Sequence, residues 1–180
     1  MSTPFTHRLA QLDDLDRLRV VMQRSIEDLQ KGFLSPAQIK ASHGVMGIDT
    51  QLVRDQTYFI IEHGADIAGC GGWSWRSTLY GGDDSVVARE PVALDPSKDA
   101  ARVRAMYTDP AFARRGIGRM LLSLCESAAR NAGFSRVELM ATLSGEPLYR
   151  AAGYEPIERI LSKPINGEQV PLIHMSKSLR

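Results

Sequence analysis

The stretch from Thr108 to Gly133 limits the choice of fold most, because it joins an extended run, a glycine-containing turn and a helix without interruption. The extended run ends at Asp109-Pro110, where proline removes a backbone donor and restricts the residue before it. Apolar residues then follow at the spacing i, i+4, i+7 and i+11 of one buried helix face: Ile117, Leu121, Leu124 and Ala128. The stretch therefore predicts a strand that leads through a tight turn into an amphipathic helix.

The turn has the composition of an anion-binding site. Its residues include two glycines and three arginines: Arg114, Arg115, Gly116, Gly118 and Arg119. The first N–H groups of a helix have no partner within it, the helix dipole adds about half a positive charge there, and glycine lets a ligand approach the backbone. We therefore expect a phosphate or diphosphate group at this turn, although a tight turn without a ligand is the alternative for these residues alone.

Two common phosphate-binding motifs do not fit the turn. A P-loop has Lys and Ser or Thr after its last glycine, whereas Arg119 and Met120 follow Gly118. A dinucleotide fingerprint needs a third glycine or an alanine three positions after the second, and Leu121 stands there. The ligand of the turn therefore belongs to another class.

Further along the chain, Arg136 to Met140 reads as a strand, and the segment P-L-Y-R-A-A-G-Y-E-P follows at 147–156. With these segments in this order, the chain resembles the GCN5-related N-acetyltransferases, the GNAT superfamily. The sequence A-R-R-G-I-G at 113–118 corresponds to the family loop Q/R-x-x-G-x-G/A, and Y-R-A-A-G-Y at 149–154 corresponds to Tyr-x-x-x-Gly-Phe/Tyr. The resemblance covers residues 98–160 closely and the rest by the order of elements. Ala113 and Thr142 depart from the family's usual Gln or Arg and its frequent Asn.

The resemblance implies an acetyl-CoA-dependent N-acetyltransferase that needs no metal and moves the acetyl group directly to an amine of a small molecule or a protein. The backbone of one strand would hold the pantetheine arm as an added strand, and the glycine turn would hold the diphosphate. The implied cofactor-binding residues are Met106, Tyr107, Thr108, Arg114, Arg115, Gly116, Ile117, Gly118, Arg119 and Thr142. Family members also often form dimers, so a homodimer is a further expectation.

Tyr149 matches the family position that donates a proton to the departing sulfur. A phenol with a pKa near 10 stays protonated at neutral pH, so it is available as a general acid. A packed tyrosine without a catalytic role is the alternative. No general base can be assigned: Glu62, Glu138 and Glu146 have the right chemistry but no predicted place at the pocket, and water-relayed deprotonation serves equally well.

The fold that the remaining pattern predicts is α+β: one domain over residues 1–180 with a mixed, mostly antiparallel twisted sheet and helices on both faces. Predicted strands lie at 5–10, 57–62, 67–75, 102–108, 136–140, 155–162 and 170–177, with helices at about 13–30, 36–41 and 117–132. Asn166-Gly167 predicts a tight hairpin turn. The region 77–100 has little pattern, which is typical of a lid, a partner contact or disorder.

Composition limits which partners, cysteine chemistry and cellular location can be expected. A net charge of +1 gives no reason to expect nucleic acid or an anionic membrane as a partner. The two cysteines, Cys70 and Cys125, lack metal-ligand spacing and are expected to be buried free thiols. With no stretch that predicts a leader or a membrane span, we expect a cytoplasmic enzyme. The alternative function is a non-catalytic module that binds CoA or acyl-CoA.

Overall fold

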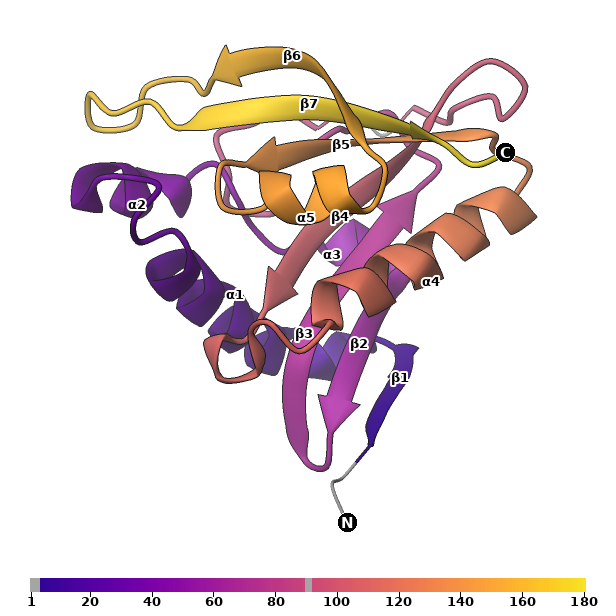
Figure 1. Ribbon diagram of the computed structural model, residues 1–180, viewed down its shortest axis with the longest axis horizontal. Helices are drawn as coiled ribbons and strands as arrows, with labels where there is room; N and C mark the ends of the chain where they lie inside the picture. Colours follow the sequence, from indigo (N-terminus) through magenta and orange to yellow (C-terminus); the bar gives the residue numbers. More distant parts are fainter. Residues whose placement is uncertain (1–3, 90–91) are drawn as a thin grey trace.

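The computed structural model describes residues 4–89 and 92–180, and the strands of this part form a seven-stranded sheet in the order β1-β2-β3-β4-β5-β7-β6 (Figure 1). The strands are β1 (Phe5–Leu9), β2 (Tyr58–His63), β3 (Asp66–Ser74), β4 (Ala101–Thr108), β5 (Arg136–Thr142), β6 (Glu155–Leu161) and β7 (Pro171–Ser178). All neighbours are antiparallel except β4 and β5, which are parallel.

Helices cover both faces of the sheet. The α-helices are α1 (Leu15–Leu29), α2 (Pro36–Ser42), α3 (Thr50–Arg54), α4 (Ile117–Asn131) and α5 (Glu146–Ala151), with short 3-10 helices η1 (Leu12–Asp14) and η2 (Pro110–Phe112). In Figure 1, α4 and α5 lie in front of the sheet, whereas α1 and α3 lie behind it. The α+β fold expected from the sequence, with a parallel crossover through one long helix, is confirmed.

The buried face of α4 explains why this helix forms where the sequence predicts it. Ile117, Leu121, Leu122 and Cys125 are all at most 2 % exposed and pack on the sheet. Burial of several such side chains supplies most of the stability of a helix in a protein. The helix thus fixes the turn before it against β3 and β4.

The sheet opens between β4 and β5. The two strands pair only at Ala101 with Val137 and at Arg102 with Glu138, and then they diverge. Figure 1 shows β5, β6 and β7 running across the ends of the steep strands β2 to β4. From Val103 onward, the backbone edge of β4 that faces β5 is therefore not used by the sheet.

A bulge in β4 lies at this opening. The register between β3 and β4 shifts between Cys70 and Gly72, and Ala105 has a φ of 52°, which few residues other than glycine adopt. The Tyr58 hydroxyl donates a hydrogen bond of 2.6 Å to the Ala105 carbonyl. The glycines that the sequence places in β3 make room for this arrangement: a Cβ on Gly71 would lie 2.3 Å from Met106 Sδ, and one on Gly72 would lie 2.7 Å from the Tyr58 ring.

Several smaller expectations also hold in the described part. The predicted helix at 36–41 forms as α2, and Ser35 caps it, because its hydroxyl accepts a hydrogen bond from the Gln38 N–H at 3.1 Å. Asn166 and Gly167 have positive φ angles and form a tight turn between β6 and β7. Cys70 and Cys125 are buried free thiols. None of the described helices has the length and apolar character needed to cross a membrane.

Candidate active site

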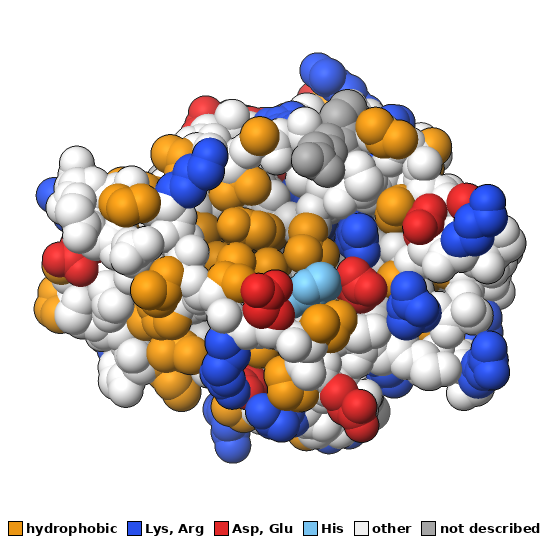
Figure 2. All heavy atoms as spheres, turned by 90° about the horizontal axis from the view of Figure 1, so that it is seen from above, with side chains coloured by type: hydrophobic (Ala, Val, Ile, Leu, Met, Phe, Trp, Pro, Cys, Tyr) orange, Lys and Arg blue, Asp and Glu red, His pale blue; other side chains and the backbone are white. Residues whose placement is uncertain are grey.

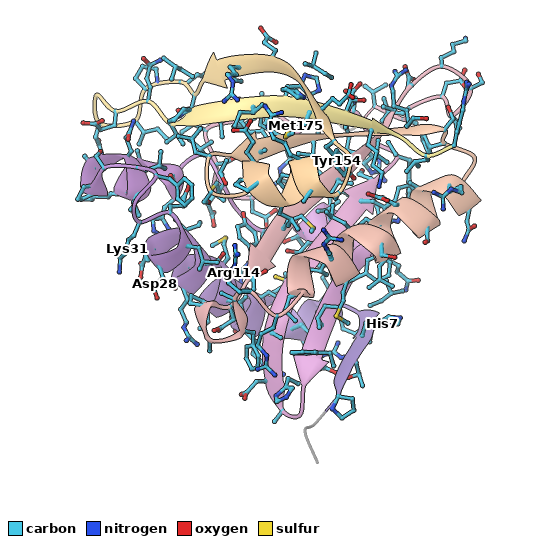
Figure 3. The ribbon with its side chains drawn as sticks, in the orientation of Figure 1. His7, Asp28, Lys31, Arg114, Tyr154 and Met175 are labelled. Carbon is cyan, nitrogen blue, oxygen red and sulfur yellow. The ribbon has the colours of Figure 1, made fainter. Side chains whose placement is uncertain are left out.

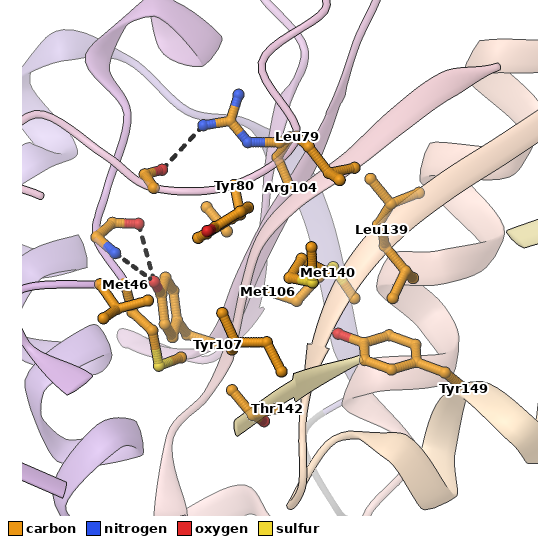
Figure 4. A pocket seen from close by; sticks show the side chains of 16 residues that line it. Met46, Leu79, Tyr80, Arg104, Met106, Tyr107, Leu139, Met140, Thr142 and Tyr149 are labelled. Atoms are coloured by element: carbon orange, nitrogen blue, oxygen red, sulfur yellow. Dashed lines mark hydrogen bonds between the residues drawn. The ribbon is translucent and has the colours of Figure 1, made fainter. Parts of the chain in front are cut away.

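A cavity of ≈ 70 Å³ lies where β4 and β5 diverge (Figure 4). It is lined by β4, β5, β7, α5, the connection between α2 and α3, and the segment after β3. The lining residues are Val45, Met46, Gly47, Leu79, Tyr80, Gly81, Val103, Arg104, Ala105, Met106, Tyr107, Leu139, Met140, Thr142, Tyr149 and Leu172. Four of the predicted site residues thus meet here: Met106, Tyr107, Thr142 and Tyr149. The cavity will be called the central pocket.

The free edge of β4 passes along the central pocket. Met106, Tyr107 and Thr108 all lie beyond the last pairing with β5, so their backbone groups on that side have no strand partner. The side chain of Tyr107 serves another purpose: its hydroxyl donates to the Gly47 carbonyl at 2.8 Å and accepts from the Gly47 N–H at 2.9 Å. An extended, amide-containing ligand can therefore pair with the backbone of β4 as an additional strand does.

The predicted phosphate turn leads directly into α4. Gly116 is the residue before the helix and has a φ of 84°, and none of the described side chains caps the helix N-terminus. The first N–H groups of α4 are thus left for an external acceptor. Gly118 allows α5 to approach, since a Cβ there would lie 2.5 Å from Leu148 Cδ2. The side chain of Ile117 is buried in the core, so this residue offers only its backbone.

The three arginines of the turn differ in what they contact. The side chains of Arg114 and Arg119 are exposed, and Figure 3 shows Arg114 on the loop before α4. Arg115 instead places its guanidinium 4.9 Å from the centre of the Phe5 ring and 5.4 Å from that of Phe112. These distances are typical of cation–π contacts, so Arg115 also ties the turn to β1.

Tyr149 lies on α5 and is 8 % exposed, with its hydroxyl directed into the central pocket (Figure 4). Its ring packs against Tyr154 with the centroids 5.9 Å apart. Desolvation by burial raises the pKa of the Tyr149 phenol above its usual value, with Cys125 a smaller cause. The hydroxyl therefore keeps its proton at neutral pH and can act as a donor.

The other polar groups considered from the sequence have different surroundings. Thr142 lines the central pocket, and its hydroxyl accepts from the Gly145 N–H at 3.2 Å. None of the three candidate glutamates lines the pocket. Glu62 pairs with Arg8 at 3.0 Å, Glu138 with Arg102 at 2.6 Å, and Glu146 with Arg159 at 2.6 Å. Among the described lining residues there is no carboxylate and no histidine.

Arg104 is a pocket residue that the sequence interpretation did not single out. It is 3 % exposed and forms an ion pair of 3.0 Å with Asp49, which is also 3 % exposed. Burial lowers the pKa of the Arg104 guanidinium, whereas Asp49 raises it. An arginine in a predicted central strand flanked by apolar residues was the available signal, because an arginine is rarely fully buried unless it is paired.

Comparison with known proteins gives a consistent result. The model of the acetyltransferase (GNAT) family matches residues 24–154. Comparison with curated proteins gives no sequence match. Among solved structures, a GCN5-related N-acetyltransferase from Rhodopseudomonas palustris is 16 % identical, with 99 % of this chain and 98 % of that chain covered and a TM-score of 0.73.

Two further solved structures share the fold. The ribosomal-protein-S18-alanine N-acetyltransferase from Escherichia coli is 15 % identical, with 98 % of this chain and 94 % of that chain covered and a TM-score of 0.60. An N-acetyltransferase from Thermoplasma acidophilum in complex with coenzyme A is 14 % identical, with coverages of 97 % and 97 % and a TM-score of 0.62. Because the family model spans most of the chain, from α1 to the end of the α5 segment, this protein belongs to the acetyltransferase (GNAT) family and is an acyl-CoA-dependent N-acetyltransferase.

Proposed function

We propose that this protein transfers the acetyl group of acetyl-CoA directly to a primary amine, with Tyr149 as the general acid. The observation that carries the proposal is the parting of β4 and β5 into one continuous site. The free edge of β4 and the Tyr149 hydroxyl line this opening, and the N-terminus of α4 packs at Gly118 against Leu148 of α5, the helix that carries Tyr149. Each of the three features suits one part of the donor. The edge of β4 suits the extended pantetheine arm, the start of α4 suits the diphosphate, and the Tyr149 hydroxyl suits the sulfur that leaves.

The donor would bind along this opening in a defined order. The diphosphate meets the N–H groups at the start of α4 and the exposed side chains of Arg114 and Arg119. The pantetheine arm pairs with the backbone of Met106 to Thr108. The thioester then lies in the central pocket beside Tyr149, within reach of an amine that enters from the side of Met46 and Tyr80.

The reaction requires one bond to form and one to break. The neutral amine nitrogen attacks the thioester carbonyl carbon, a C–N bond forms and the C–S bond breaks. A water takes the proton that the amine loses, and the Tyr149 hydroxyl gives its proton to the sulfur that leaves. Holding the two reactants together supplies much of the rate, so the absence of a carboxylate among the described lining residues is compatible with turnover.

The alternative is a protein that binds CoA or acyl-CoA without catalysis. Such a module would use the edge of β4 and the turn before α4, but it would have no use for a buried phenol that faces the sulfur. Release of free CoA thiol from acetyl-CoA in the presence of amines separates the two functions. The homodimer and the cytoplasmic location stay predictions from the sequence.

Cofactor binding can be tested by thermal unfolding with CoA, acetyl-CoA and ATP at matched concentrations. A ligand that binds only the folded state, at 100 times its dissociation constant, adds about 2.7 kcal/mol of stability. We expect both CoA species to stabilise the wild type and to lose this effect in the double variant Arg114→Glu/Arg119→Glu. The matched control is Arg54→Glu/Lys163→Glu, which makes the same change of charge on exposed residues that do not line the central pocket.

Three results would count against the proposal. They are no response to CoA, a response that ATP equals, or an equal loss in both double variants. The last of these would mean that the response depends on the overall charge rather than on the turn before α4.

A further inference from the structure

The bulge in β4 forms part of the wall of the central pocket. The register of β3 against β4 shifts here, so Ala105 and Met106 together lie opposite Gly71. Both residues of the bulge line the central pocket. Ala105 has a φ of 52°, and a residue with a Cβ keeps such a conformation only where its surroundings hold it. A contact that holds Ala105 therefore also shapes the pocket.

Tyr58 supplies such a contact from the other side of β4. Its hydroxyl donates the 2.6 Å hydrogen bond to the Ala105 carbonyl, and the residue is 1 % exposed in the core. Tyr58 belongs to β2, and its side chain reaches β4 across β3, beside Gly72. Burial raises the pKa of the Tyr58 phenol well above its usual value, so the hydroxyl keeps its proton and stays a donor.

The hydrogen bond to this carbonyl also fixes the direction of the next N–H group. The peptide bonds of the described residues are all trans, and in a planar trans peptide the C=O of one residue and the N–H of the next point in opposite directions. The Ala105 carbonyl points to Tyr58, which is not among the described lining residues of the central pocket. The pocket lies between β4 and β5, on the side of β4 away from β3 and Tyr58. The Met106 N–H is therefore directed toward the central pocket.

The Met106 N–H lies where the thioester of the donor is expected. The arm that pairs with β4 starts at the turn before α4 and runs from Thr108 toward Met106, so the thioester comes to lie beside Met106. In Figure 4, Tyr149 points from α5 toward the part of the pocket that Met106 lines from β4. Most of the lining is apolar, including Leu139 and Leu172, and hydrophobic side chains also gather in the middle of the upper face of the molecule (Figure 2). In such surroundings a hydrogen bond to a developing charge is stronger than in water.

We propose that Tyr58 is a positioning residue of the transfer reaction: its hydrogen bond to the Ala105 carbonyl turns the Met106 N–H toward the thioester carbonyl oxygen. As the amine nitrogen bonds to the carbonyl carbon, one electron pair of the C=O bond moves to this oxygen. The Met106 N–H donates to the oxygen while it carries the negative charge, and the pair returns to the carbon as the C–S bond breaks. Tyr58 itself touches neither substrate. The proposal rests on the acetyltransferase function argued above and adds to it a residue outside the pocket.

The first test removes only the hydroxyl, in Tyr58→Phe. We expect kcat, followed by release of CoA thiol from acetyl-CoA with propylamine as a minimal acceptor, to fall about ten-fold or more, because the Ala105–Met106 peptide is no longer held. The dissociation constant for CoA, which has no thioester carbonyl, should stay within about two-fold of wild type. Thr57→Val is the matched control, because Thr57 is 3 % exposed and its hydroxyl donates to the Leu52 carbonyl at 3.2 Å, away from the central pocket. Its kcat should stay within about two-fold of wild type.

A binding comparison tests the same inference without turnover. Acetyl-CoA carries the thioester carbonyl oxygen, and S-ethyl-CoA has the same carbon chain without it. We expect the wild type to bind acetyl-CoA at least about three-fold more tightly than S-ethyl-CoA, as one additional hydrogen bond predicts. Tyr58→Phe should lose most of this preference, whereas Thr57→Val should keep it.

A double variant separates positioning from a general loss of stability. In Tyr58→Phe/Ala105→Gly, glycine adopts the positive φ without steric cost, so the bulge persists without the hydroxyl. We expect part of the lost turnover, at least about three-fold, and part of the preference for acetyl-CoA to return. Should Tyr58→Phe not fold, comparison of this double variant with Ala105→Gly measures the effect of the hydroxyl in its place, and the preference for acetyl-CoA should again be smaller without the hydroxyl.

The outcomes separate this inference from the acetyltransferase function. Equal affinity of the wild type for acetyl-CoA and S-ethyl-CoA would mean that the Met106 N–H does not meet the carbonyl oxygen, so the inference fails while the acetyltransferase function stands. Equal losses in Tyr58→Phe and Thr57→Val, or no recovery in the double variant, would make Tyr58 a structural residue only. If the wild type prefers acetyl-CoA but transfers its acetyl group to no amine, the acetyltransferase function fails, and only the orientation of the bound carbonyl by Tyr58 stands.

Discussion

At the scale of single residues, Tyr149 combines burial with an uncommitted hydroxyl. The phenol lies in the central pocket and forms no hydrogen bond with another described residue, whereas its neighbour Tyr154 donates to Glu126 at 3.0 Å. We expect Tyr149→Phe to lower turnover by about ten-fold or more, because proton donation to the leaving sulfur is lost. The dissociation constant for CoA should change little, since the proposed binding site consists of the edge of β4 and the turn before α4. Steady-state release of CoA thiol and titration of CoA measure the two quantities.

Tyr154→Phe is the matched control for that change. It removes a hydroxyl from a ring that packs directly on Tyr149, but this hydroxyl points to α4 rather than into the pocket. Turnover within about two-fold of wild type is expected. Unchanged turnover in Tyr149→Phe would remove Tyr149 from the mechanism, and an equal loss in both variants would mean that the two rings act through packing.

At the scale of elements, the sequence predicts the strands and the helices α1, α2 and α4, but it predicts neither α5, which carries Tyr149, nor the opening of the sheet. The spacing of apolar residues predicts α4, and the glycines before it predict the turn. The bulge at Ala105 has no signal of its own, because alanine is an unremarkable residue in a strand and its positive φ depends on contacts from Tyr58, far away in the sequence. Arg104 meets Asp49 and Gly81 in the same long-range way. Tertiary contacts of this kind cannot be predicted from local pattern.

Gly71 and Gly72 test how β3 supports the bulge. In Gly71→Ala the new Cβ would meet Met106 Sδ, the flexible end of a side chain that lines the central pocket. In Gly72→Ala it would lie 2.6 Å from the Thr57 carbonyl and 3.1 Å from Tyr58 Cα, which are backbone atoms that cannot move aside. We expect Gly72→Ala to lower the free energy of unfolding by about 2–3 kcal/mol and Gly71→Ala by about 1 kcal/mol or less. Gly71→Ala should nevertheless lower turnover.

Urea unfolding and CoA-thiol release measure these two effects on the same pair of variants. The neighbouring glycines are controls for each other, because both substitutions add one methyl group to the same strand. Equal losses of stability would show that Met106 is held as rigidly as the backbone. Full activity in Gly71→Ala would show that the position of Met106 does not matter to the reaction.

At the scale of the whole molecule, the described core buries several groups that lose a proton at alkaline pH. The described core contains two thiols and four phenols whose pKa values are raised by burial: Cys70, Cys125, Tyr58, Tyr107, Tyr149 and Tyr154. For Cys70 the pKa is raised to about 12. In the unfolded chain the thiols ionise near pH 8.5 and the phenols near pH 10. The stability that these neutral groups contribute is therefore complete below about pH 8 and is lost as the pH rises through these values.

The size of this loss can be measured with one variant. At pH 10, ionisation of each thiol in the unfolded chain lowers the free energy of unfolding by about 2 kcal/mol. Ionisation of each phenol lowers it further, by about a few tenths of a kcal/mol. Cys125→Ala removes one thiol from the core, so it lowers stability at pH 7 but should make the decline between pH 8 and pH 10 shallower by about 2 kcal/mol. Urea unfolding at pH 7, 8, 9 and 10 gives the slope of the free energy of unfolding against pH for the wild type and for the variant. Identical slopes in the variant and the wild type would mean that Cys125 ionises as readily in the folded protein as in the unfolded chain, which its complete burial between α4 and the sheet does not allow.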